Sequence, residues 1–229
     1  VFRILPKELA AEVFVEMDRD LQQHLIESFS NTELKDVIDE LFMDDMVDII
    51  DEMPASVAQR ILKQTDSKTR NMVNKLLAYP ESSAGSVLTT EYLSVKKGMT
   101  VDEAFESIRN NAVDTESIYT CYVTDRSRKL LGVITIRDLL LADKSAVVYD
   151  IMDENVIFAN TLTDREEVVS LFDKYDLYVL PVVDNENRLV GIITVDDVID
   201  VMQEEATEDI EMMAAILPSE KSYLKTGVF

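Results

Sequence analysis

The sequence predicts a multidomain fold with three parts. An all-α superhelical solenoid of short helices comes first, an α/β repeat pair follows, and an amphipathic helix ends the chain. The first part is predicted by an apolar pattern that recurs every twelve residues, and the second by a segment that recurs at an offset of 59 residues. The last part is predicted by a crowding of acidic residues after residue 195.

The twelve-residue period occupies about the first 78 residues. Its leading apolar positions are Val13, Leu25, Val37, Ile49, Ile61 and Val73. Most members have an apolar partner four residues further on, which is the spacing of one helix face. Residues that commonly start helices lie between these pairs, at Pro6, Asp18, Ser30, Pro54 and Asp66. We therefore expect about six short helices over residues 1–80, each too small to be stable alone.

From residue 81 onward, strands and helices alternate, and the pattern occurs twice. The segment "LLGVITIRDLLL" (130–141) matches "LVGIITVDDVID" (189–200), so Gly132 corresponds to Gly191 and Asp138 to Asp197. Each copy predicts a short opening segment, a helix, two strands joined by a polar turn, and a second helix. We expect the copies at residues 81–145 and 146–203, packed together because neither can cover both faces of its own sheet.

Composition narrows the class of function. The formal net charge of −23 argues against nucleic acid as a partner and favours cations. The single Cys121 excludes an internal disulfide and fits a reducing cytosol. No apolar stretch of 18 residues is present, so no segment is expected to span a bilayer. The chain carries no P-loop, no dinucleotide-binding glycine motif and no nucleophile elbow, which argues against an enzyme.

The acidic C-terminal segment predicts a two-faced helix. Residues 203–213 read "QEEATEDIEMM" and follow "TVDDVID". As one helix, residues 197–213 carry an apolar stripe of Ile199, Met202, Ala206, Ile210 and Met213. The opposite stripe is acidic and consists of Asp197, Asp200, Glu204, Glu208 and Glu211.

The two copies resemble a pair of CBS motifs, most specifically in the strand–"G-(V/I)-I-T-x-x-D"–helix ending. The whole order of parts resembles the cytosolic region of the MgtE-type magnesium transporter and channel family, with "YPESSAGSVLTTEY" after the solenoid and "TVDDVIDVMQEEATEDI" after the second copy. The resemblance implies a homodimer formed through the CBS domains at the cytoplasmic face of the cell membrane. It also implies a plug or connecting helix over residues 204–229, leading to a transmembrane pore domain absent from this chain.

The same resemblance implies that the chain senses intracellular Mg²⁺, which would bridge acidic surfaces of the three parts and favour the closed state. Mg²⁺ prefers oxygen ligands and keeps several waters, so one or two carboxylates often hold it. Two carboxylates about 4 Å apart repel by roughly 4 kcal/mol at an effective dielectric near 20, and an intervening divalent ion reverses that sign. The positions that match the family's ligands are Glu12, Asp44, Asp48, Gly85 through its carbonyl, Glu166, Asp176, Asp197, Glu205, Glu208 and Asp209.

A second hypothesis is an adenine-nucleotide-sensing CBS module with the solenoid as a helical adaptor. In many CBS modules the Thr and Asp of the motif contact a ribose or its phosphates. The first copy offers Thr135 and Asp138 with Arg137 beside them, whereas the second copy has Asp196 where Arg137 stands. Because Asp196 would repel a phosphate, ATP or another adenine nucleotide is expected at Asp138.

Overall fold

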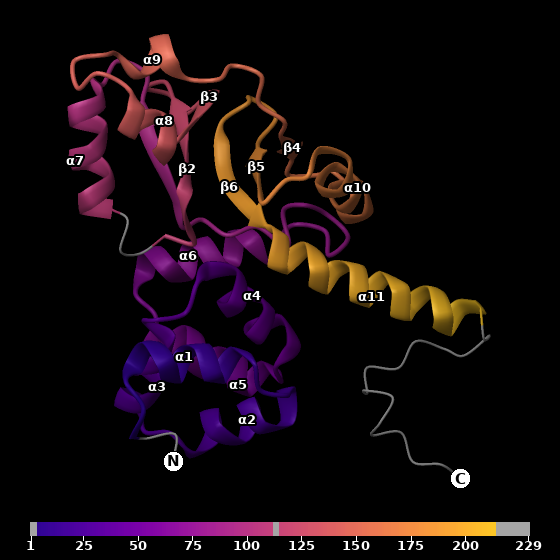
Figure 1. Cartoon of the computed structure of the whole chain (residues 1–229). Coiled ribbons are helices and arrows are strands. Elements are labelled where there is room, and N and C mark those ends of the chain that lie inside the picture. Colours follow the sequence, from indigo (N-terminus) through magenta and orange to yellow (C-terminus); the bar gives the residue numbers. More distant parts are fainter. Residues whose placement is uncertain (1–3, 112–114, 214–229) are drawn as a thin grey trace.

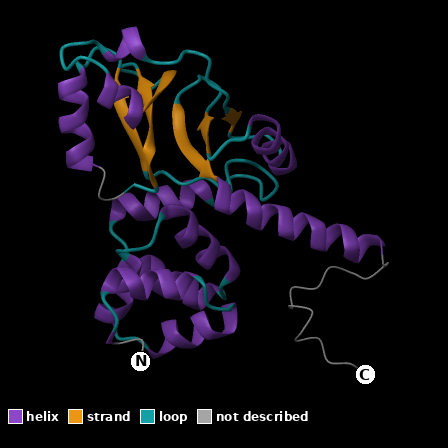
Figure 2. Ribbon diagram, in the orientation of Figure 1, coloured by secondary structure: helices purple, strands orange, loops and turns teal. Residues whose placement is uncertain are grey.

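The structure, a computed structural model, describes residues 4–111 and 115–213. Six short helices make up the N-terminal part, and two small sheets with their own helices stand above it (Figure 1). One long helix leaves the second sheet and extends past the body of the molecule (Figure 2). The predicted order of solenoid, α/β pair and terminal helix is confirmed.

The solenoid consists of α1 (Lys7–Val15), α2 (Arg19–Ser28), α3 (Asn31–Ile38), α4 (Met43–Glu52), α5 (Ala55–Gln64) and α6 (Ser67–Leu76). Their N-caps are twelve residues apart, at Pro6, Asp18, Ser30, Phe42, Pro54 and Asp66. The side chains of Asp18, Ser30 and Asp66 accept hydrogen bonds from backbone amides of the first turn, which fixes each start locally. The five helix starts expected from the sequence are thus confirmed. Phe42 starts α4 without a capping side chain.

The twelve-residue series supplies the buried face of the solenoid in its later members. Val37, Ile49 and Ile61 are at most 5% exposed, while Val13 in the first helix remains 37% exposed. The hydrophobic cluster of the solenoid continues through the connecting segment into the second sheet and includes Ala84, Leu88, Leu180, Ile193 and Val198. The first sheet buries a separate cluster of its own. The solenoid is therefore joined by apolar packing to the second α/β copy.

The two α/β copies share one topology. The first contains β1 (Tyr92–Lys96), α7 (Val101–Asn111), β2 (Ser117–Thr124), β3 (Leu130–Thr135) and α8 (Ile136–Leu141), and α9 (Val148–Ile151) follows it. The second contains β4 (Ala159–Asn160), α10 (Arg165–Tyr175), β5 (Val179–Val183), β6 (Leu189–Thr194) and α11 (Val195–Met213). In both sheets the first two strands are parallel and the last two are antiparallel.

Each copy pairs its opening segment with the last strand of the other copy. Thr89, ahead of β1, exchanges two backbone hydrogen bonds of 2.9 Å with Ile192 in β6. Asp153, ahead of β4, exchanges bonds of 2.8 and 2.9 Å with Val133 in β3. These crossed pairings tie the two copies into one unit, as the sequence repeat led us to expect.

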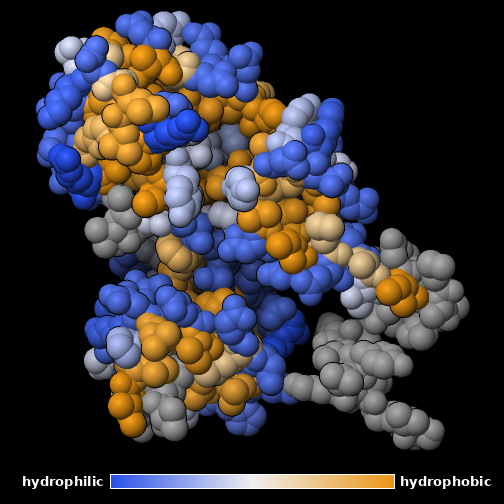
Figure 3. Space-filling view, viewed as in Figure 1, coloured by the Kyte–Doolittle hydropathy of each residue, from blue (hydrophilic) through white to orange (hydrophobic). Residues whose placement is uncertain are grey.

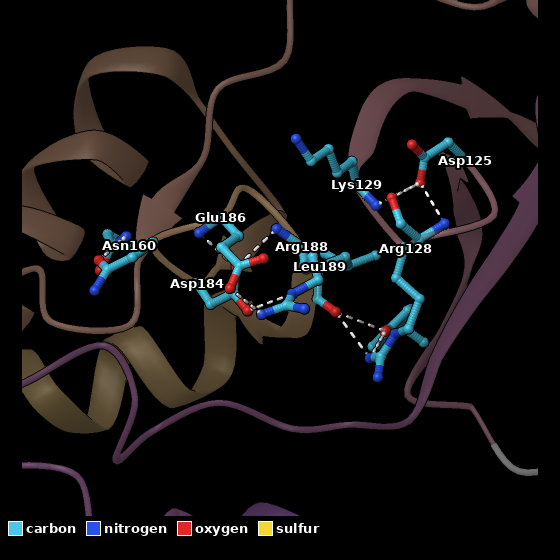
Figure 4. A network of polar contacts seen from close by, with 11 residues as sticks. Asp125, Arg128, Lys129, Asn160, Asp184, Glu186, Arg188 and Leu189 are labelled. Atoms are coloured by element: carbon cyan, nitrogen blue, oxygen red, sulfur yellow. Dashed lines mark hydrogen bonds and ion pairs between the residues drawn. The ribbon is translucent and has the colours of Figure 1, made fainter.

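The hairpin turns of the two copies also meet, as Figure 4 shows. The amide of Leu130 donates to the carbonyl of Asn187, and the amide of Leu189 donates to the carbonyl of Arg128, both at 3.0 Å. Arg128 and Asn187 are equivalent at the offset of 59 residues, and both have positive φ, of 69° and 59°. The pair is thus related by an approximate two-fold symmetry that extends to its turns.

The crossed pairing explains the glycine of the repeated motif. A Cβ on Gly191 would collide with the carbonyl oxygen of Thr89, and a Cβ on Gly132 would lie 2.7 Å from that of Asp153. Gly191→Ala and Gly132→Ala should each lower the free energy of unfolding by about 1–3 kcal/mol, because the backbone of the other copy cannot retreat without losing its hydrogen bonds. Urea denaturation measures this effect.

The matched control for these variants is Gly98→Ala, because nothing lies within 4 Å of the added Cβ at that position. Its stability should equal or slightly exceed that of the wild type. If all three alanine variants were equally stable, close approach of the two copies would not be the reason for the motif glycines.

Candidate functional site

An open cavity of about 760 Å³ lies between the solenoid and α11. Figure 3 shows a recess between the upper and lower parts of the molecule that is bordered by hydrophilic residues. Acidic side chains from distant parts of the sequence line the cavity: Asp44, Asp45, Asp48, Asp51, Glu52, Glu81, Asp197, Asp200 and Glu204. The fold therefore concentrates negative charge at the junction of the solenoid and the second copy.

Two helices position most of these acids. Asp44 and Asp48 lie one turn apart on α4, so both side chains face the cavity. Asp197 lies in the first turn of α11, directly after β6. Its Oδ2 accepts hydrogen bonds from the hydroxyl of Thr194 at 2.5 Å and from the amide of Thr194 at 3.2 Å. The end of the strand thus fixes the orientation of this carboxylate.

Asp44 has the most perturbed environment of these acids. Its side chain is buried, with the residue only 8% exposed, and its Oδ1 has no hydrogen-bond partner among the described residues. Burial, followed by the charges of Asp197 and Asp45, raises the pKa of Asp44 to about 9. A buried carboxylate of this kind is costly to ionise unless a positive charge joins it.

The pKa values of the neighbouring carboxyls are raised as well. Burial, and then Asp197, raises the pKa of Asp45 to about 6. Burial, and then Asp45, raises the pKa of Asp48 to about 7, although solvent still reaches this side chain through the open cavity and screens part of the effect. The pKa of Asp197 is also raised by burial, against the lowering effect of its bonds to Thr194. Near neutral pH these groups oppose one another's ionisation.

The first α/β copy adds a carboxylate that the sequence analysis missed. Glu116 lies just ahead of β2, and its Oε2 is buried without a hydrogen-bond partner among the described residues. Burial, followed by the charges of Asp197 and Asp196, raises the pKa of Glu116 to about 7. Nothing in the sequence near Glu116 indicates this placement, because it arises from the packing of the parts.

Two arginines on the cavity wall are already paired. Arg19 at the start of α2 forms an ion pair of 2.6 Å with Glu52. Arg165 at the start of α10 has a largely buried side chain and donates to Glu205 at 2.5 Å and to Glu204 at 3.0 Å. Glu205, expected as a metal ligand, therefore has a protein cation as its partner in this structure.

Four other expected metal residues, Glu12, Gly85, Glu166 and Asp176, are not among the residues that line the cavity. Glu12 is an exposed residue of α1, and Glu166 is an exposed residue in the first turn of α10. Asp176 ends α10 in the left-handed conformation, with φ of 50°. Gly85 is buried, and its amide donates to the carbonyl of Thr161 at 2.9 Å. The side chains of two further expected ligands, Glu208 and Asp209 of α11, lie outside what the structure describes.

The geometry favours a hydrated cation over a tightly enclosed one. Among the side chains that the structure describes, no three of Asp, Glu, His or Cys converge closely enough to enclose a metal ion. The orphaned Oδ1 of Asp44 and the mutual repulsion of its neighbours nevertheless fit a positive charge. Mg²⁺ binds readily in this way, through few carboxylates and several retained waters.

The expected nucleotide residues form a separate, exposed group. Thr135 and Asp138 make a capping box at the start of α8, in which the Thr135 hydroxyl donates to Asp138 at 2.5 Å and the Asp138 amide donates to Thr135 at 3.1 Å. Both residues and Arg137 are open to solvent. In the second copy the equivalent Asp197 faces the acidic cavity, where an anionic phosphate would be repelled.

Three family-model matches cover nearly the whole chain. Residues 1–82 match the MgtE intracellular N domain, and residues 84–145 and 148–204 each match the CBS domain. None of the described helices is both long and apolar enough to cross a membrane.

The chain is also similar to named proteins. The magnesium transporter MgtE of Thermus thermophilus is 42% identical over 231 residues, which is 99% of this chain and 51% of that protein. The magnesium transporter MgtE of Bacillus subtilis is 36% identical over 200 residues, which is 87% of this chain and 44% of that protein. The chain thus spans about half the length of the curated relatives it matches.

Two solved structures share the fold. The crystal structure of the cytosolic domain of the Mg²⁺ channel MgtE in complex with ATP has a TM-score of 0.82 and 42% identity, covering 87% of this chain and 82% of that one. The crystal structure of the soluble part of a magnesium transporter has a TM-score of 0.83 and 31% identity, covering 90% of this chain and 81% of that one. These relatives are transporters or channels and not enzymes, which agrees with the motif analysis. The chain therefore belongs to the MgtE family and corresponds to its N domain and CBS pair.

Proposed function

We propose that this chain is the Mg²⁺-sensing regulatory module that gates a magnesium transporter or channel. The observation that carries the proposal is the buried carboxylate of Asp44, whose Oδ1 has no partner among the described residues, in a cavity shared with Asp48 and Asp197. Ionising these groups together without a cation is unfavourable, since burial raises the pKa of each. A cation from the cytosol would remove that cost.

In this proposal the contact between the acids is unfavourable without the ion and favourable with it. Without a divalent cation, the acids of α4 and the start of α11 can lie together only by holding protons or by repelling one another. With Mg²⁺ between them, Asp44 and Asp48 of the solenoid and Asp197 of the CBS pair would hold the two parts together. Mg²⁺ supplies two positive charges and retains water, so carboxylates that lie across an open space suffice. Since the ion binds the joined arrangement better, its concentration shifts the population towards the closed state.

Helix α11 is the element that would transmit this contact to the pore as a plug helix. Arg165 ties Glu204 and Glu205 of α11 to α10, so the helix should move together with the second CBS domain. The apolar stripe of α11 is left open, with Ile199 49% and Ile210 66% exposed. Contact between this stripe and the protein's own membrane domain, at the cytoplasmic face of the membrane, would cover it.

A homodimer through the CBS domains belongs to the same proposal. Leu140 and Leu141 at the end of α8 are 68% and 76% exposed, and Tyr149 of α9 is 48% exposed. Large apolar side chains on adjacent helices suit a contact with a second copy. Sedimentation of the chain in EDTA should give twice the monomer mass, and a monomer would contradict this part.

A second candidate function is the binding of ATP or another adenine nucleotide, which the ATP complex of the 42% identical channel domain supports. On this chain the exposed Thr135, Arg137 and Asp138 are the residues proposed to contact it. The guanidinium of Arg137 would meet a phosphate, while Asp138 would accept hydrogen bonds from a ribose.

Calorimetry with Mg²⁺, and separately with ATP and AMP, distinguishes the two functions. Asp44→Asn and Asp197→Asn should each weaken Mg²⁺ binding about tenfold or more, because each removes a charged ligand worth about 1.5–3 kcal/mol. Their effects should not add, because both carboxylates contact one ion.

Asp173→Asn is the matched control for these variants, because it removes the same charge from an exposed position on α10. It should leave the Mg²⁺ isotherm unchanged, and Asp138→Asn should affect only nucleotide. If calorimetry detects the binding of a nucleotide but not of Mg²⁺, the first function is refuted and the second is supported.

The raised pKa values predict a pH dependence in the absence of divalent ions. The pKa of Asp44 lies near 9 in the folded chain, against an ordinary value of 3.8. Between these values the folded state holds a proton that the unfolded state has released, so the free energy of unfolding should fall as pH rises through this range. Asp44→Asn should flatten the slope when thermal melting is followed from pH 5 to 9 in EDTA. A variant as steep as the wild type would show that Asp44 ionises normally.

A further inference from the structure

We propose that Glu116 is an additional ligand of the junction cation, so that the same ion also engages the first CBS domain. The proposal rests on the Mg²⁺-sensing function proposed above and adds a residue and a domain to its site. It rests on the buried carboxylate oxygens that the fold leaves without a partner. Within the described residues, two carboxylate oxygens meet that description, Oδ1 of Asp44 and Oε2 of Glu116.

The backbone of Glu116 is held rigidly at this place. Its amide donates to the carbonyl of Glu91 at 2.9 Å, next to the point where Ser117 of β2 pairs with Tyr92 of β1. The side chain of Glu91 is occupied locally, because its Oε2 accepts hydrogen bonds from Thr89 and Thr90. Among the described residues of this region, Oε2 of Glu116 is therefore the buried carboxylate oxygen that lacks a donor.

Two of the charges around Glu116, those of Asp197 and Asp45, belong to acids that line the cavity. Asp197, Asp196 and Asp45 all act on it, and Glu116 in turn is one of the charges that act on the buried Asp44. Acids of the solenoid, of the first CBS copy and of α11 are thus within electrostatic range of one another. Asp44, which is 8% exposed and whose Oδ1 has no partner among the described residues, lines the cavity.

Within the described part of the chain, no ion pair or hydrogen bond joins a protein cation to Asp44 Oδ1 or Glu116 Oε2. The two arginines of the cavity wall are engaged elsewhere, Arg19 with Glu52 and Arg165 with Glu204 and Glu205. A mobile divalent cation that keeps part of its water shell can join carboxylates that do not touch one another. Such an ion would connect the first CBS domain, the second CBS domain and the solenoid in one contact.

The experiment compares Glu116→Gln with the wild type in EDTA and in Mg²⁺ at constant ionic strength. Removing a charge from a like-charge cluster should raise the melting temperature in EDTA. The rise in melting temperature caused by Mg²⁺ should shrink, and calorimetry should give about tenfold weaker Mg²⁺ binding. Glu154→Gln is the control, because it removes the same charge from an exposed position between the two copies. It should match the wild type in all three measurements.

Two results would overturn the proposal, and they are distinguishable. A wild type that ignores Mg²⁺ would remove the sensing function and this inference together. If the wild type responds to Mg²⁺, and the Glu116→Gln variant melts lower in EDTA but responds to Mg²⁺ equally, then Glu116 has only a structural role. If Glu116→Gln does not fold, Glu116→Asp keeps the charge but withdraws the carboxylate by one methylene. It should fold and bind Mg²⁺ more weakly, and wild-type affinity would refute the proposal.

Discussion

The repulsion between carboxylates at the junction of the solenoid and the second CBS domain is the interaction on which the rest of the structure depends. Apolar packing that runs from the solenoid through Ala84 and Leu88 to Val198 draws the two parts together. The same approach brings Asp44 of α4 opposite Asp197 of α11. Neither the apolar packing nor the repulsion determines the arrangement alone, because the acids can lie close together only when a proton or a cation neutralises them. In the proposed function, a cation sets this balance.

The CBS pair supplies the rigid frame for this balance. Each copy pairs its opening segment with the last strand of the other, and their turns meet, so backbone hydrogen bonds join the two copies. Helix α11 follows β6 directly, which places Asp197 at the end of the sheet. Arg165 pairs with Glu204 and Glu205 and so joins α11 to α10. The solenoid meets this frame through one apolar cluster and one acidic cavity. In the proposed function it is the part that moves.

Local features of the fold could be predicted from the sequence, and long-range contacts could not. The twelve-residue period located the helix starts, because caps such as Ser30 act through adjacent amides. The sequence shows the motif glycines Gly132 and Gly191, but glycine is needed there because the backbone of the other copy lies too close for a Cβ. Resemblance indicated Asp44, Asp48 and Asp197, which the fold does bring to one cavity. Contacts between segments far apart in the sequence bury Oε2 of Glu116 and pair Glu205 with Arg165. No local sequence pattern predicts such contacts.

Small-angle scattering at increasing Mg²⁺ and constant ionic strength tests the central claim most directly, because it reports how closely the solenoid and the CBS pair approach. The account predicts a radius of gyration that falls with Mg²⁺ in the wild type. In a variant carrying both Asp44→Asn and Asp197→Asn, the radius should start lower and respond less. The same radius with and without the ion in the wild type would contradict an acidic junction closed by a divalent cation.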